Sequence, residues 1–301
     1  MIAVCGEALM DLVPFGTGTT YEALPGGSPA NTAVALARLG VPVMLLARLS
    51  DDGFGRQLRT HLTANRVDLS RAVVAAERSS LAIVTQAGDG SASYRFDLDR
   101  TADWQWTADE LPALPADVAA VHAGSLALAQ PPGSVALEAF LGRCRQSSTI
   151  SLDPNLRPAL LSPTARMDVE RWLGLADLVK VSTDDLALLY PGAEPVEVAQ
   201  RWAGAGPALV VVTMAEQGAL AVLSGQVVRR PAVAVTVADT VAAGDTFSAA
   251  LLDHLFRGGH LGGRLDGLTP PVVEAALDWA LRAAAVTCSR VGADPPYAAE
   301  L

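Results

Sequence analysis

The chain has 301 residues, half of them hydrophobic, and a formal net charge of −10 at pH 7. This length can bury the core of one large α/β domain, whereas the acidic balance argues against nucleic acid as a partner, because phosphate backbones are bound through basic patches. No apolar segment is long and uncharged enough to predict a membrane span, and the first residues lack the basic start of a signal peptide, so we expect a cytoplasmic protein.

The amino-terminal quarter reads as alternating strands and helices. Residues 2–9 form an apolar run that predicts a strand ending near Asp11. The helix after it is expected to begin at Ser28, a residue type that favours the N-cap position. A second strand is expected over residues 43–49, and Asp52 opens the next helix.

The composition changes between residues 73 and 107. Segments 81–86 and 91–96 alternate polar and apolar side chains around a glycine-containing turn at 88–90, a pattern that predicts a β-hairpin. No helix separates these strands, so we interpret residues 73–107 as a β-ribbon lid, to which residues 11–24 add strands. The α/β core would then consist of residues 1–10, 25–72 and 108–301.

Strands and helices alternate again from residue 118. Strands are expected at 118–123, 149–152, 178–181 and 208–213, and helices at 134–145, 163–173, 195–203 and 271–288. This rhythm is typical of a doubly wound, mainly parallel sheet that helices cover on both faces. Residues 219–223 and 227–235 predict a β-meander at the end of it.

A turn of small residues precedes the next-to-last helix. The β-branched run at 233–238 predicts a strand leading into it. Ala242, Ala243 and Gly244 let a ligand come close, and the free N–H groups of the following helix, with the positive end of its dipole, form an anion pocket. Asp245 in that pocket is either a helix cap or a general base beside a transferring group.

Several common nucleotide-binding motifs are missing from the sequence. Lys180 is the only lysine and follows a valine, so a Walker A loop cannot form, and no G-x-G-x-x-G follows a strand. Asp97 opens a D-x-D-x-T pattern like that of aspartate-nucleophile phosphatases, but it follows a polar ribbon and not a buried central strand. The cysteines and histidines show no metal-ligand spacing.

Four motifs, in order along the chain, resemble the PfkB (ribokinase-like) family of carbohydrate kinases. They are G-G-S-P-A-N at 26–31, D-G-F-G at 52–55, D-P-N-L-R at 153–157 and D-T-V-A-A-G-D at 239–245. The resemblance covers essentially the whole chain. Within the family, residues 124–125, 153–158 and 290–296 look most like those of fructokinases.

The resemblance implies a role for each matching residue. Asp245 would be the catalytic base, and the anion hole would consist of Ala242, Ala243 and Gly244. The sugar would be bound by Asp11, Gly26, Gly27, Asn31, Tyr94, Arg95 and Arg157, with Tyr94 and Arg95 on the lid and Gly26 and Gly27 also acting as a hinge. The nucleotide would be bound by Lys180, Ser182, Thr213, Ala215, Gly218 and Gly244. Asp185 would help to place magnesium, and a monovalent-cation site would involve Asp239, Val241 and Gly292.

Three positions depart from the family pattern. Ser182 and Asp185 stand where the family has Asn-x-x-Glu, and the shorter carboxylate is expected to act on magnesium through water. Ala242 replaces the more common glycine, which is tolerable with a negative φ angle. Ala215 also stands where glycine is usual.

The function that the resemblance implies is transfer of the γ-phosphate of MgATP to a sugar hydroxyl, with fructose as the expected acceptor and potassium as a further cofactor. The alternatives within enzymes are 2-keto-3-deoxygluconate, another sugar or a nucleoside. A non-catalytic sugar sensor is the alternative outside enzymes, against which the intact Asp245 argues. The lid is a surface through which the chain could form a homodimer.

Overall fold

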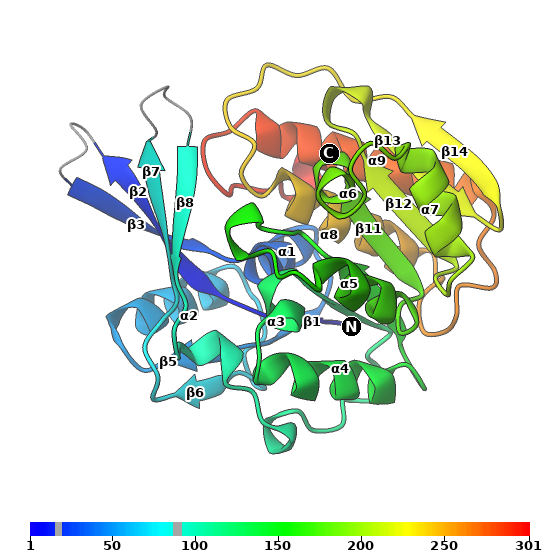
Figure 1. The fold of residues 1–301 in the computed structure, drawn as a ribbon. Helices are drawn as coiled ribbons and strands as arrows, with labels where there is room; N and C mark the ends of the chain where they lie inside the picture. The colour runs from blue at the N-terminus through cyan, green and yellow to red at the C-terminus, as the bar shows by residue number, and fades with distance from the viewer. Residues whose placement is uncertain (16–19, 87–91) are drawn as a thin grey trace.

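The structure, a computed structural model, describes residues 1–15, 20–86 and 92–301. An eight-stranded sheet runs through the centre of the molecule in the order β14-β13-β12-β11-β10-β9-β1-β4 (Figure 1). Its strands are β1 (Ile2–Cys5), β4 (Val43–Leu46), β9 (Ala120–Gly124), β10 (Thr149–Asp153), β11 (Leu178–Ser182), β12 (Leu209–Thr213), β13 (Ala219–Leu223) and β14 (Gln226–Arg230). The six strands from β4 to β12 pair in parallel, and β13 and β14 continue as an antiparallel meander. The doubly wound, mainly parallel sheet predicted from the sequence is confirmed.

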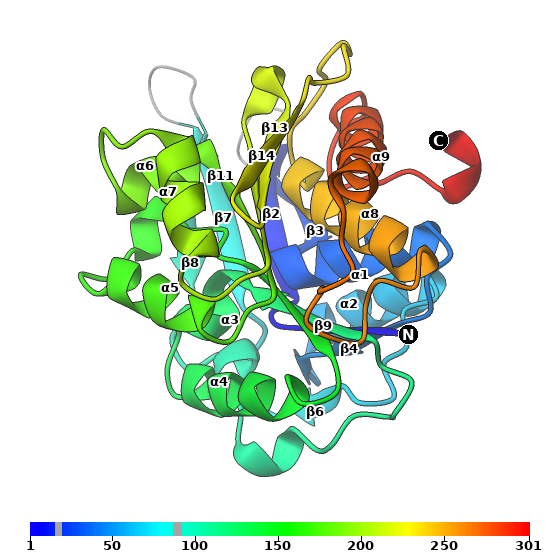
Figure 2. The same cartoon turned by 90° about the vertical axis from the view of Figure 1, so that its right-hand side faces the viewer.

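Helices cover both faces of this sheet (Figure 2). One layer consists of α1 (Ser28–Arg38), α2 (Gly53–Ala64), α8 (Ala243–Arg257) and α9 (Pro270–Cys288). The other consists of α3 (Ser125–Ala129), α4 (Gly133–Cys144), α5 (Ala165–Leu173), α6 (Thr183–Leu189) and α7 (Pro195–Ala203). Strands covered on both sides need apolar side chains on both sides, which explains the continuous apolar runs of β1, β4 and β12. Among the described residues, no helix is long and apolar enough to cross a membrane.

A second sheet of four strands projects from one side of the core (Figure 1). Its order is β3-β2-β7-β8, from β2 (Leu9–Phe15), β3 (Thr20–Gly26), β7 (Leu81–Gln86) and β8 (Ala92–Asp97). We call these four strands the lid sheet. The two predicted strands of the hairpin are present and antiparallel. The predicted turn at 88–90 lies outside the described residues.

The boundaries of the predicted lid differ from those of this sheet. At one end, β6 (Val73–Ala75) pairs with β5 (Arg48–Ser50) in a separate two-stranded sheet. At the other end, Trp104 and Trp106 are buried in the core cluster beneath α4. The residues that flank the lid sheet are therefore part of the core, because their large apolar side chains pack there.

Two predicted strands are interrupted. The run 2–9 is not one strand, because the chain bends at Gly6, where an added Cβ would lie 2.4 Å from Cγ of Pro29. Similarly, the run 43–49 is divided between β4 and β5. Each break sends the chain from the central sheet into a different sheet.

The predicted strand at 233–238 is wrong. These residues form an irregular segment that leaves β14 and crosses to α8. Val233, Val235 and Val237 are 41%, 38% and 60% exposed, so their β-branched side chains have no sheet to pack on. β-Propensity reflects the fit of a side chain to a neighbouring strand, and the described structure offers none here.

Candidate active site

A cavity of about 410 Å³ lies between the carboxyl ends of the central strands and the lid sheet. This is the edge of an open α/β sheet where ligands bind. The predicted site residues that line it are Asp11, Gly27, Asn31, Tyr94, Arg157, Lys180, Val241, Ala242, Gly244 and Asp245. Residues from the first 31 positions and from beyond position 240 thus meet at one cavity.

Asp245 lies in the first turn of α8 and is only 7% exposed. Its Oδ1 accepts a hydrogen bond of 2.6 Å from the Ser28 hydroxyl, and its Oδ2 accepts one of 3.0 Å from Nδ2 of Asn31. Burial raises the pKa of the carboxyl, and these two bonds act in the opposite direction. The carboxylate is therefore held by α1, and it does not cap its own helix.

These two bonds change the expectations for α1. Ser28 was expected to cap the helix, but Gly27 occupies the cap position and no side chain caps it. Asn31 was expected to bind a sugar hydroxyl; its side chain lines the cavity, and its Nδ2 also donates to Asp245. Both side chains point across to α8 because α1 and α8 pack against each other.

The turn before α8 has a conformation that the sequence did not predict. Ala242 has a φ angle of +60°, in the left-handed region, and not the negative value that an alanine favours. Its carbonyl accepts the first helical hydrogen bond, from the N–H of Thr246 at 2.8 Å. The conformation turns the chain sharply, and Ala242 and Gly244 border the cavity.

Lys180 places a buried positive charge beneath this turn. Its Nζ donates to Oδ2 of Asp153 at 2.8 Å, and an added Cβ on Gly244 would lie 3.0 Å from the same nitrogen. Burial lowers the pKa of Lys180, but the neighbouring carboxylate of Asp153 more than offsets this, so the pKa is raised. The amine therefore stays charged, and together with the N-terminus of α8 it makes this end of the cavity attractive to anions.

Two further carboxyl groups, those of Glu7 and Asp11, line the same cavity. Burial raises the pKa of Glu7 to about 7. Burial likewise raises the pKa of Asp11 to about 6, although the Arg157 guanidinium acts against this. Asp11 also explains why residue 26, the first of the G-G-S-P-A-N motif, is a glycine, because a Cβ on Gly26 would lie 2.1 Å from Oδ2 of Asp11.

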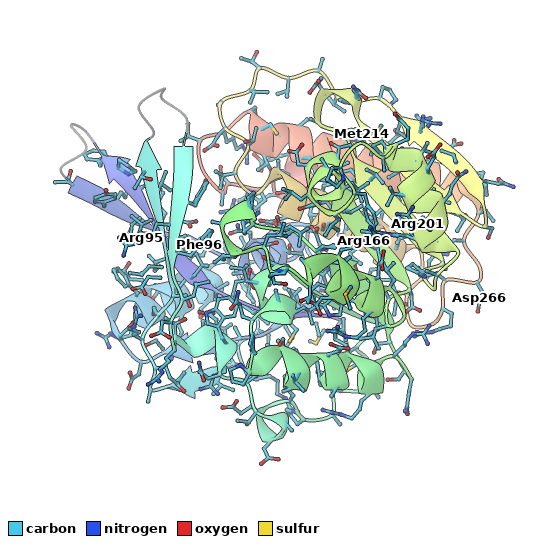
Figure 3. All side chains as sticks on the ribbon, viewed as in Figure 1. Arg95, Phe96, Arg166, Arg201, Met214 and Asp266 are labelled. Carbon is cyan, nitrogen blue, oxygen red and sulfur yellow. The ribbon has the colours of Figure 1, made fainter. Side chains whose placement is uncertain are left out.

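Of the two predicted lid residues on β8, Tyr94 lines the cavity and Arg95 does not. Tyr94 and Phe96 line the cavity, and their rings stack with centroids 6.1 Å apart. Successive side chains of a strand point to opposite faces, so Arg95 lies on the far side of β8, as Figure 3 shows. The expectation that Arg95 closes over the sugar is not met by this arrangement.

The predicted nucleotide-binding residues gather beside Lys180. Ser182 and Thr213 are directly paired in register at the ends of β11 and β12. The loop after β12 is closed by a bond of 2.8 Å from the N–H of Met214 to the carbonyl of Gly218. Ala215 within it has a φ angle of +46°, so it adopts a left-handed conformation where the family usually has glycine.

Asp185, the predicted magnesium residue, is engaged in hydrogen bonds. Its Oδ1 accepts from the N–H of Leu156 at 2.7 Å, and its Oδ2 accepts from the N–H and the hydroxyl of Ser182 at 3.1 and 2.6 Å. Ser182 and Asp185 thus form a capping box at the start of α6. The capping box is by itself a sufficient structural reason for a serine at 182 and an aspartate at 185.

The three residues predicted to surround a monovalent cation lie together. Asp239 accepts hydrogen bonds from the N–H of Val241 at 3.1 Å and from the N–H of Gly292 at 2.8 Å. Its carboxylate therefore joins the loop before α8 to the loop after α9. Across the described part of the chain, no group of three or more His, Cys, Asp or Glu side chains is arranged to hold a metal ion.

Glu7 and Ser125 are among the polar residues of the cavity that the sequence reasoning missed as site residues. Glu7 lines it and is 1% exposed. Ser125, which follows β9, lines the same cavity. Both come directly after a strand of the central sheet, which is the signal that could have identified them.

Comparisons with known proteins agree with this geometry. The pfkB family of carbohydrate kinases matches residues 1–299. A fructokinase of Rhizobium leguminosarum bv. trifolii is 36% identical over 260 residues, which cover 85% of this chain and 79% of that protein.

Solved structures give the same result. A fructokinase double mutant from Vibrio cholerae O395, in its fructose-, ADP- and potassium-bound form, has a TM-score of 0.85 and 30% identity over 97% of this chain and 94% of its own. A fructokinase from Xylella fastidiosa with bound ATP has a TM-score of 0.89 and 26% identity, covering 97% of this chain and 93% of its own. The chain belongs to the pfkB family of carbohydrate kinases.

Proposed function

We propose that the protein is an ATP-dependent fructokinase, which transfers the γ-phosphate of ATP to a hydroxyl of fructose to give fructose 6-phosphate. The observation that carries the proposal is the position of Asp245, a buried carboxylate between a helix N-terminus and a cavity lined with polar side chains. Relatives that are named fructokinases support the choice of acceptor.

In this mechanism Asp245 accepts the proton of the sugar hydroxyl while the hydroxyl oxygen attacks the γ-phosphate in line. The backbone of Ala242, Ala243 and Gly244 stabilises the charge on the transferring oxygens, and Lys180 adds a positive charge from below. Burial raises the pKa of Asp245, which makes the carboxylate a better proton acceptor than an exposed aspartate.

The nucleotide is proposed to lie along the ends of β11 and β12, with Ser182, Thr213, Ala215 and Gly218 beside it. Magnesium would bind chiefly to phosphate oxygens, as it commonly does, and neutralise part of their charge. The hydrogen bonds to Asp185 suit an indirect contact through water. For potassium, Asp239 already links the two loops whose backbone would surround the ion.

The sugar is proposed to occupy the end of the cavity near Asp11 and Arg157. A carboxylate and a guanidinium offer acceptors and donors for neighbouring hydroxyls, and a site built on such bonds rejects analogues that lack them. The carboxylate of Asp11 would disfavour an acidic sugar such as 2-keto-3-deoxygluconate, and the Arg157 guanidinium would act in the opposite direction. Tyr94 covers the cavity from the lid sheet.

Two roles are proposed for the lid sheet. It would close over the bound sugar about the Gly26-Gly27 pair and so exclude water, which competes as an acceptor. It would also form a homodimer contact, since Phe15 and Tyr21 are 64% and 47% exposed on its strands.

Steady-state kinetics on a panel of acceptors tests the proposal. We expect the kcat/KM for fructose to exceed those for ribose, nucleosides and 2-keto-3-deoxygluconate. Asp245→Asn should lower kcat by about 10² to 10⁴-fold while sugar and ATP still bind. Asp253→Asn, a matched change further along α8 and outside the cavity lining, serves as the control. If the Asp245→Asn variant kept more than about a tenth of wild-type activity, Asp245 would not be the general base. A tenfold preference for 2-keto-3-deoxygluconate would exclude fructose as the acceptor and leave the family unaffected.

A further inference from the structure

Ser28 is the first residue of α1, and its hydroxyl does not serve that helix. A serine at the start of a helix commonly bonds to the backbone of its own first turn. Here no side chain caps α1, and the buried Ser28 hydroxyl donates to Oδ1 of Asp245 at 2.6 Å, across 217 residues of sequence. A bond of this length to a buried carboxylate is a strong, charge-assisted one.

This bond is one of two neutral contacts that stabilise the anionic form of the base. The other comes from Nδ2 of Asn31, on Oδ2. The charged groups that face the carboxylate are Lys180 on β11, Asp153 on β10 and Asp11 on β2. Burial and Asp153 raise the pKa of Asp245, whereas Ser28, Asn31 and Lys180 lower it.

The two bonds also fix the orientation of the carboxylate. Each carboxylate oxygen has two lone-pair directions, and α1 occupies one on each oxygen. The carboxylate cannot rotate without breaking one of these contacts. The lone pairs that remain are therefore held in one direction relative to the cavity, which is the condition for efficient proton transfer.

We propose that Ser28 is a positioning residue for Asp245. The Ser28 hydroxyl orients the Asp245 carboxylate and keeps it ionised for proton abstraction from the sugar. The inference rests on the proposed function, because it assigns Asp245 as the base. It adds a residue that the sequence suggested only as a helix cap.

The test is the pH dependence of turnover in Ser28→Ala, with Ser28→Thr as the variant that retains the hydroxyl. Loss of a hydrogen bond to a charged group should lower kcat on the order of tenfold to a hundredfold, with smaller changes in the KM values for fructose and ATP. The acidic limb of the kcat profile should move to higher pH, because the carboxylate loses a donor. Ser28→Thr should restore both. In the control Ser148→Ala, a buried hydroxyl is lost from the bond to the Val118 carbonyl, and the profile should not move.

A merely structural role predicts a different result. Ser28→Ala would then lose stability, as Ser148→Ala does, while its kcat and its acidic limb stay at the wild-type values, and this outcome would overturn the proposal.

The Ser28–Asp245 coupling can also be measured without turnover. We expect the free energy of unfolding of Ser28→Ala to fall more steeply with rising pH than that of the wild type, because a buried carboxyl without its donor resists ionisation. In an Asp245→Asn background this difference should vanish. Parallel pH curves for wild type and Ser28→Ala would refute the coupling. Absence of turnover of every sugar by the wild type would instead refute the proposed function.

Discussion

Glu7 offers a stability prediction that depends on one buried carboxyl. It is 1% exposed, and one of its oxygens, Oε2, has no hydrogen-bond partner among the residues that the structure describes. Burial raises its pKa from the ordinary value of 4.5 to about 7, with the Ser125 hydroxyl acting in the opposite direction. Its side chain is almost fully buried, so solvent screens this effect much less than it would at the surface.

The sign of the effect follows from proton binding. The unfolded chain loses the Glu7 proton near pH 4.5, whereas the folded protein keeps it up to about pH 7. Between these values the unfolded state binds fewer protons, so the free energy of unfolding decreases as the pH rises. At about 1.4 kcal/mol per pH unit, Glu7 costs about 3 kcal/mol once the pH exceeds 7.

Glu7→Gln removes this cost, because glutamine has almost the same shape and never ionises. The amide fills the same space, and its contribution to the free energy of unfolding does not vary with pH. We therefore expect the stability of Glu7→Gln relative to the wild type to increase by about 2 to 3 kcal/mol between pH 5 and pH 8.

Urea unfolding followed by tryptophan fluorescence measures this difference. Glu197→Gln, on the exposed surface of α7, is the control and should give a difference that stays constant with pH. If the stability difference between Glu7→Gln and the wild type also stayed constant with pH, the fold would not keep this carboxyl protonated, and burial would not raise its pKa.

Two further substitutions test the conformations of Ala242 and of β8. Ala242→Gly should raise the free energy of unfolding by about 1 kcal/mol, because the left-handed conformation penalises an alanine. Ala243→Gly, in the helix itself, should not, and equal effects would contradict the left-handed φ angle. Tyr94→Ala should raise the KM for the sugar, since its ring lines the cavity, whereas Arg95→Ala should keep kcat/KM within about twofold. Equal losses in these two kinetic assays would contradict the orientation of β8.

The sheet was predictable because its strands carry the signal along the sequence. The strand at 208–213 is almost entirely a short apolar run, as burial on both faces requires, and it corresponds to β12. The run at 233–238 is likewise rich in β-branched and apolar residues, but it has no neighbouring strand among those described. Composition indicates that a segment is suited to a strand, but whether another strand lies beside it depends on the tertiary structure.

The candidate site was predictable where chemistry is local. Small residues followed by Asp245 indicate an anion-binding turn within a few positions. The Ser28 bond could not be inferred, because a serine before a helix satisfies the local N-cap pattern equally well. Likewise, the orientation of Arg95 depends on the exact register of β8, which a shift of one residue reverses.

The distance between Ser28 and Asp245 along the chain has a consequence for synthesis. Protein chains emerge amino-terminus first, so the segment that carries Glu7, Asp11 and Asn31 is synthesised long before α8. On the proposed function, a nascent chain would therefore contain these groups while Asp245, the proposed base, is still absent. Turnover would begin only when the carboxyl-terminal part of the protein closes a 217-residue loop onto α1, so a chain truncated before α8 is expected not to consume ATP.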